Sequence, residues 1–108
     1  MIYINKLKNK LKTATKKFNL PVNYEEIDSQ TRREVRLQYI DEQDGKCCHC
    51  GSKLTDEPMS KRWTINESLF PKGFFAYPIH LHHNHKTGMT IGAIHSYCNA
   101  YLWQYKGE

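Results

Sequence analysis

The sequence lacks a long apolar run, an acidic residue in its first twenty positions, and any internal repeat or low-complexity segment. Because a membrane-spanning helix needs about twenty consecutive apolar residues, we expect no membrane segment. Met1–Ile4 lead straight into lysines, without the apolar core of a secretory signal, so we expect a cytoplasmic protein. At 108 residues, the chain predicts one small domain whose core a bound metal would help to stabilise.

Cysteine is scarce and poorly spaced for a framework of disulfides. Three of the four cysteines lie within residues 47–50, and the fourth is distant. Cys47-x-x-Cys50 followed by Gly51 has the spacing of a zinc knuckle, and His95-x-x-Cys98 offers two more ligands one helical turn apart. We therefore predict a structural zinc ion, because four protein ligands close the tetrahedral shell of the metal.

Two neighbouring residues within the knuckle could also offer ligands. Because the turn is tight, we expect both side chains to point away from the metal. The prediction is that Cys48 is a small buried residue and His49 an exposed one.

The formal charge of +5 is concentrated at the N-terminus, where the first twenty residues contain six lysines. Apolar residues at helical spacing predict that residues 1–22 form a basic amphipathic arm ending near Pro21. Its apolar stripe would pack on the body of the chain or on a second protomer, giving a homodimer. A polyanion such as DNA suits the lysines, and a solvated helix face is the alternative. The lysines predicted to contact DNA are Lys6, Lys10, Lys16, Lys17 and, near the C-terminus, Lys86.

A second helix is expected to start at the Asn23–Glu26 capping box or at Ser29, and to run to Gln43 before Gly45. Its buried side would consist of Val35, Tyr39 and Ile40. Its arginines lie among acidic residues, which favours a solvated face over a phosphate contact. Those arginines are Arg32, Arg33 and Arg36.

Residues 52–78 carry weaker patterns. A strand is predicted at Trp63–Ile65, a turn at Pro71–Gly73 and a second short strand at Phe74–Tyr77. The aromatic side chains of this segment are expected in the core.

The stretch 79–103 predicts a strand, a loop, a strand and a helix. Residues 79–83 alternate as a strand does, 84–89 contain a turn, 90–94 form a second strand, and Ser96 is the expected N-cap of the helix.

Five of the six histidines lie between positions 80 and 95, a density typical of metal or general-base chemistry. On a strand, His82 and His83 should project to opposite faces, which favours one metal ligand and one base. Asn99 follows Cys98, so the zinc would fix its position. The side-chain carbonyl of Asn99 could serve as a hard oxygen ligand.

These residues carry a resemblance to a known family. His82-His83-Asn84-His85-Lys86-Thr87-Gly88, followed by Gly92-Ala93-Ile94-His95-x-x-Cys98-Asn99, resembles the HNH nucleases, and most closely the phage recombination endonuclease VII group. The resemblance implies an α+β domain with N-terminal helices, a zinc knuckle and a ββα-metal (His-Me finger) motif, residues 23–108 being the nuclease domain. It also implies a phage or mobile-element origin.

The roles implied by the resemblance are those of a one-metal DNA endonuclease. His83 would be the general base, His82 and Asn99 the ligands of a catalytic Mg²⁺ or Mn²⁺, and His85 a supporting residue. The second ring nitrogen of His83 would be oriented by a loop carbonyl or by Asn84. The products would carry 5′-phosphate and 3′-hydroxyl ends.

Three features depart from the family pattern. His95 replaces a cysteine, and a longer segment separates Cys50 from His82. His82 and Asn84 replace carboxylates, so we expect Mn²⁺, Ni²⁺ or Zn²⁺ to compete well with Mg²⁺. Two other functions fit parts of the sequence: a non-catalytic zinc module that binds DNA or protein, and a metal-storage domain.

Overall fold

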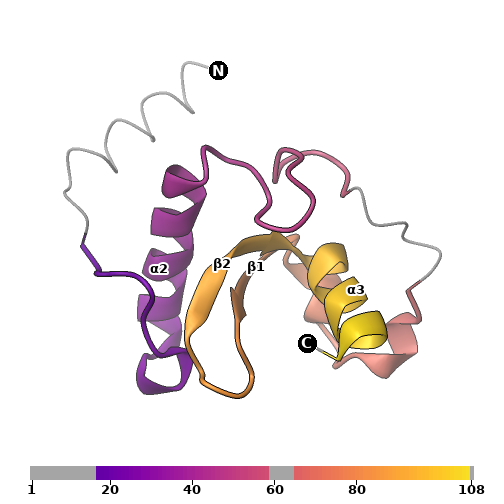
Figure 1. Cartoon of the computed structure of the whole chain (residues 1–108). Helices are drawn as coiled ribbons and strands as arrows, with labels where there is room; N and C mark the ends of the chain where they lie inside the picture. The colour runs from indigo at the N-terminus through magenta and orange to yellow at the C-terminus, as the bar shows by residue number, and fades with distance from the viewer. Residues whose placement is uncertain (1–16, 59–64, 108) are drawn as a thin grey trace.

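The computed structural model describes residues 17–58 and 65–107, which form a small α+β unit (Figure 1). A two-stranded antiparallel sheet lies between two helices, α2 on one side and α3 on the other. The predicted α+β class is confirmed. The elements in chain order are η1 (Tyr24–Glu26), α2 (Ser29–Glu42), η3 (Glu67–Leu69), η4 (Phe74–Ala76), β1 (Ile79–His83), β2 (Thr90–His95) and α3 (Ser96–Lys106).

Most of the predicted N-terminal arm lies outside the described residues, together with its predicted dimer contact and three of the lysines predicted to contact DNA (Lys6, Lys10 and Lys16). Residues 17–22 contain no helix. Among the described residues, no helix is both long enough and apolar enough to cross a membrane.

Helix α2 begins at the second of its two predicted starts. Asp28 is its N-cap and accepts a hydrogen bond of 2.8 Å from the backbone N–H of Thr31. The earlier Asn23 instead caps the short η1. At the other end, the backbone N–H of Gly45, at φ +73°, donates to the carbonyl of Ile40 at 2.8 Å, which stops the helix as the glycine predicted.

Strands β1 and β2 pair as a hairpin whose register breaks once. Leu81 lies opposite Ala93 and His82 opposite Gly92, but His83 lies opposite Thr90, so the pairing skips Ile91. Such a bulge alters the local twist and can re-aim neighbouring side chains.

The hairpin loop is closed by Asn84. Its side-chain oxygen accepts from the backbone N–H groups of Lys86, at 2.8 Å, and Thr87, at 3.0 Å. Asn84 therefore stabilises the turn, and the loop residues 84–89 are confirmed as a connection between strands.

The core lies between α2 and the sheet and continues to α3 and the knuckle. Val35 and Tyr39, four residues apart on α2, are buried, and the Tyr39 hydroxyl lies 2.9 Å from the hydroxyl of Thr90. Ile40 packs against this core as a partly buried neighbour. The buried cluster consists of Val35, Tyr39, Cys47, Leu54, Leu81, Ala93, Ile94 and Cys98.

Two segments dock on β2 in addition to β1. The amide of Gln43 accepts from the backbone N–H of Ala93 at 2.7 Å and donates to its carbonyl at 2.9 Å, as another strand would. On the loop side, the N–H of Thr90 donates to Val22 O at 2.9 Å, and the N–H of Tyr24 donates to Gly88 O at 2.7 Å. These contacts hold the C-terminal end of α2 and the segment that precedes α2 against the hairpin.

Two local predictions are wrong. Phe74–Ala76 form the 3-10 helix η4 and not a strand, because Gly73 at φ +87° turns the chain into it. Phe70, Phe74 and Phe75 pack on one another at half-buried positions and not in the core, while Tyr77 is 72% exposed. Of the strand predicted at Trp63–Ile65, Trp63 and Thr64 lie outside the described residues, and Ile65 is buried but not in a strand.

The N-cap of α3 also differs from the prediction. His95, the last residue of β2, occupies the cap with an extended backbone, and Ser96 is already the first helical residue. Strand and helix are thus joined without a linker. The order strand, loop, strand, helix is confirmed for residues 79–106.

Candidate active site and metal centre

Four predicted zinc ligands come together where the knuckle meets the junction of β2 and α3. The ligand atoms of Cys47, Cys50, His95 and Cys98, the Cys₃His cluster, all lie within 4.8 Å of one another. His95 Nδ1 is 3.5 Å from Cys50 Sγ and 3.7 Å from Cys98 Sγ. Nitrogen and sulfur ligands of a tetrahedral zinc ion lie roughly 3.6 Å apart, so the cluster has the size to hold one.

The imidazole of His95 is oriented by its other nitrogen. Nε2 lies 3.0 Å from Lys53 O and 3.1 Å from Asp56 O, and because carbonyl oxygens accept, Nε2 carries the hydrogen. The lone pair of Nδ1 therefore faces the three sulfur atoms. This outer support is usual for a metal-bound histidine.

The sulfur of Cys47 is strongly polarised by its neighbours. Its neighbour Cys98, together with backbone N–H groups that include those of His49 and His95, lowers the pKa of Cys47 to about 3 despite burial. A thiolate is the form that binds metal, so the donor set suits zinc.

Cys48 and His49 both lie outside the Cys₃His cluster, as expected, and His49 is exposed. The predicted burial of Cys48 is wrong, since this residue is exposed. Its backbone N–H donates to Ala93 O at 3.0 Å, which places the residue at the edge of β2, above Gly92.

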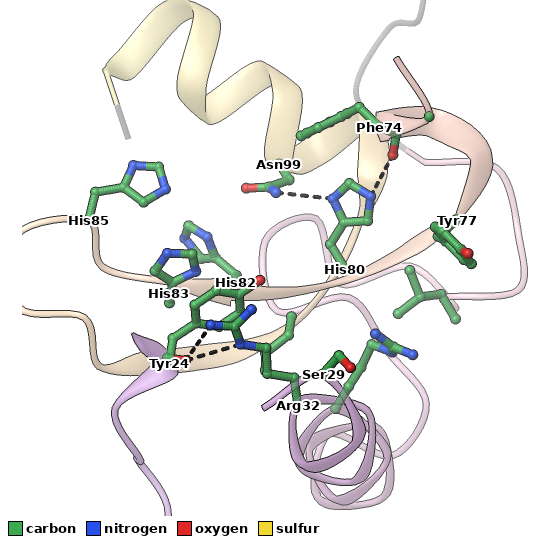
Figure 2. A pocket seen from close by; sticks show the side chains of 14 residues that line it. Tyr24, Ser29, Arg32, Phe74, Tyr77, His80, His82, His83, His85 and Asn99 are labelled. Atoms are coloured by element: carbon green, nitrogen blue, oxygen red, sulfur yellow. Dashed lines mark hydrogen bonds between the residues drawn. The ribbon is translucent and has the colours of Figure 1, made fainter. Parts of the chain in front are cut away.

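A pocket of about 460 Å³ lies between α2, β1 and the start of α3 (Figure 2). We call it the histidine pocket. Among the described residues that line it are two arginines and four histidines, but no aspartate or glutamate. The predicted site residues among them are His82, His83, His85 and Asn99.

His82 and His83 do not point to opposite sides of the sheet as predicted. Both line the histidine pocket, and both also line a second hollow of about 270 Å³ that contains Lys86 and Lys106. The register break between His82 and His83 interrupts the regular alternation of the strand. His82 is buried, at 7% exposure, and His83 is half-buried.

Asn99 is oriented by a histidine that had no predicted role. His80 Nε2 lies 2.8 Å from Phe74 O, so it carries the hydrogen, and Nδ1 accepts from the Asn99 amide at 3.1 Å. Burial lowers the pKa of His80, which favours this neutral form. With its NH₂ group engaged, Asn99 directs its oxygen away from His80, toward the side of His85 (Figure 2).

The ring of His83 is held by an aromatic neighbour. Tyr24 stacks on it with the ring centroids 3.9 Å apart and the planes 7° from parallel, and His85 lies edge-on at 4.9 Å. Burial, then the charge of His85, lowers the pKa of His83. The neutral imidazole, which can accept a proton, is thereby favoured near neutral pH.

Three further predicted contact residues, Asn84, Lys86 and Lys17, differ in whether their side chains are available for the predicted contact. Asn84 is committed to its turn, so its side chain is not the expected partner of His83. Lys86 is exposed beside the histidines, as a DNA contact would be. Lys17 lies 2.7 Å from the carboxylate of Glu34, which would compete with phosphate for it.

The sequence patterns missed four residues that shape the pocket. Tyr24 and His80 support predicted site residues, and Arg32 and Arg36 line the pocket from α2 instead of facing solvent. The spacing of Arg32 and Arg36, one helical turn apart, was the available signal. It was obscured by the acidic residues around them.

Comparisons of this chain with protein-family models, with curated proteins and with solved structures found no match.

Proposed function

We propose that this protein is a metal-dependent endonuclease of the HNH type that hydrolyses phosphodiester bonds in DNA. The observation that carries the proposal is the histidine pocket, which contains a half-buried, stacked imidazole beside a second imidazole and an oriented amide oxygen. These are the group types needed for a general base and a divalent metal site.

In this proposal, His82 and Asn99 would hold the divalent ion. Their nitrogen and oxygen donors suit Mn²⁺, Ni²⁺ or Zn²⁺, and Mg²⁺ with more difficulty, because no carboxylate lines the described pocket. When bound, the ion would neutralise the charge that develops on the phosphoryl and leaving oxygens.

His83 would take the proton of the attacking water. The stack with Tyr24 limits the orientations of its ring, and its lowered pKa keeps it available as a base. His85, with its ring 4.9 Å from that of His83, would contact the phosphate or assist at the metal.

The Cys₃His cluster has a positioning role in this scheme. Cys98 belongs to the cluster and the next residue, Asn99, belongs to the pocket, both on the first turn of α3. A zinc ion in the cluster would fix that turn, and His80 would fix the rotation of the Asn99 amide.

A non-catalytic, zinc-stabilised DNA-binding module is the second candidate. The absence of carboxylates from the described lining favours it, since most hard divalent ions bind through carboxylate oxygen. The same absence leaves the pocket attractive to phosphate whether or not catalysis occurs.

Nicking of supercoiled plasmid tests the proposal. With Mg²⁺ or Mn²⁺, the protein is expected to nick, and His83→Ala to slow nicking about 100-fold or more, because a general base contributes about 10²–10⁴ in rate. His49→Ala is the matched control, since His49 is exposed and lies outside both the pocket and the cluster. Equal nicking by the two variants would remove His83 as the base, and plasmid binding without any nicking would favour the binding module.

A further inference from the structure

Helix α2 contributes the cationic wall of the histidine pocket. Arg32 and Arg36 lie one turn apart on this helix, are half-buried, and line the same pocket as His80, His82 and His83. Surface arginines on a solvated helix face need no such burial, and Arg33 between them is exposed. The pocket therefore receives two of the three arginines of α2.

Arg32 is held in place before any ligand arrives. Its Nε and one Nη both donate to the carbonyl of Tyr24, at 3.0 and 2.8 Å, and its guanidinium lies 3.7 Å from the centre of the Tyr24 ring. Because guanidinium has five N–H donors, three remain for another acceptor. The same Tyr24 ring stacks on His83, so Arg32 and the candidate base are positioned by one residue.

The positive charge of Arg36 is not neutralised by a carboxylate in the described pocket lining. Among the described residues, no hydrogen bond or ion pair is found for Arg36, and no carboxylate lines the pocket beside it. Burial, followed by the charge of Arg33, lowers the pKa of Arg36, and the charge of Arg36 in turn lowers that of His80. A half-buried guanidinium without a carboxylate favours an external anion.

We infer that Arg36, with Arg32 beside it, forms an anion subsite on the α2 side of the histidine pocket that binds a backbone phosphate of the nucleic acid. The inference rests on the proposed function for the identity of the anion. Lys86 and Lys106 line the second hollow, so cations lie on both sides of His82 and His83, as a charged strand crossing the histidines would require.

The test compares two arginines of the same helix. Arg36→Gln and Arg33→Gln remove the same charge, but Arg33 does not line the pocket. Binding of a fluorescein-labelled 12-base-pair DNA is measured by anisotropy at constant salt, without added divalent ion. We expect Arg36→Gln to weaken binding about tenfold to a hundredfold, the loss typical of a charge-assisted hydrogen bond, and Arg33→Gln about threefold or less.

A second measurement uses the unmodified protein, so that it does not depend on the folding of Arg36→Gln. In the unmodified protein, titration with inorganic phosphate is followed by the NMR signals of the arginine Nε–H groups, with chloride at equal ionic strength as the reference. We expect the Arg36 signal to shift and saturate with phosphate while the Arg33 signal does not. Equal effects of phosphate and chloride on Arg36, or equal DNA affinities of the two variants, would overturn the subsite.

The two proposals can fail separately. If the protein never cuts DNA but Arg36→Gln still weakens binding selectively, the subsite stands and the nuclease proposal falls. If the protein nicks plasmid and Arg36→Gln binds and nicks like Arg33→Gln, the nuclease proposal stands and the subsite falls.

Discussion

The Cys₃His cluster and the histidine pocket meet at two adjacent residues of α3, yet they are built on opposite principles. Three of the four cluster residues are buried, the ligand atoms lie within 4.8 Å of one another, and three of the four donors are sulfur. The pocket is open, its donors are imidazole and amide groups, and arginines take the place of carboxylates among its described lining. A preformed soft site can keep its ion without help, whereas a cationic pocket repels a free divalent ion.

A divalent ion in the histidine pocket would need negative charge nearby, and the described lining provides none. With Arg32 and Arg36 in its wall, the histidine pocket would gain that charge from the phosphodiester itself. We therefore expect the ion of the cluster to survive purification and gel filtration, and the ion of the pocket to bind appreciably when DNA is present. Elemental analysis that finds two tightly bound ions per chain without DNA would contradict this difference.

The largest expected effect comes from breaking the cluster. Cys98→Ala should abolish zinc binding and cooperative thermal unfolding, because structural zinc contributes about 10–16 kcal/mol in small domains, as much as the whole stability of a typical protein. Zinc content by elemental analysis and unfolding by circular dichroism measure both. Cys48→Ala is the control, since Cys48 is exposed and outside the cluster. A Cys98→Ala protein that retains one zinc ion and its melting temperature would refute the structural site.

The second largest effect is expected from a variant that changes the pocket and leaves the cluster intact. His80→Ala should lower the rate of nicking about 10–100-fold, as the loss of a supporting group around a metal does, while zinc content stays at one ion. The reason is that Asn99 loses the acceptor that fixes its amide.

His80→Asn gives this prediction its control, because the asparagine oxygen can occupy the position of Nδ1 and accept from Asn99. Partial recovery of nicking by His80→Asn supports a positioning role. Full activity of His80→Ala, or equal inactivity of both variants, contradicts it.

The smallest effect concerns the pH dependence of nicking. Because burial and His85 lower the pKa of His83, the acidic limb of the rate profile should lie below the usual 6.5 of imidazole, and a bound divalent ion would lower it further. The charge of Arg32 acts in the same direction, and that of Glu25 raises the pKa. Glu25→Gln should therefore shift the limb to lower pH and His85→Gln to higher pH. Shifts of the same sign would show that His83 does not set this limb.

The ligands of the cluster and the order of its flanking elements could be predicted from local patterns alone. Ligand spacing in Cys47-x-x-Cys50 and His95-x-x-Cys98 is local, and so are the alternation of residues 79–83 and the glycine that ends α2. Local spacing can be read without a fold, because a turn or one helical turn brings the paired ligands together.

The surroundings of the histidines could not be predicted, because they depend on contacts between distant parts of the chain. The contact of Tyr24 with His83 and the position of Arg36 in the pocket join residues that no periodicity relates. They depend on how η1 and α2 dock against the hairpin. The break at Ile91 that brings His82 and His83 to one pocket depends on pairing with the opposite strand. Charge patterns along α2 predicted a solvated face because a sequence shows which charges are neighbours along the helix, and not which of them the sheet covers.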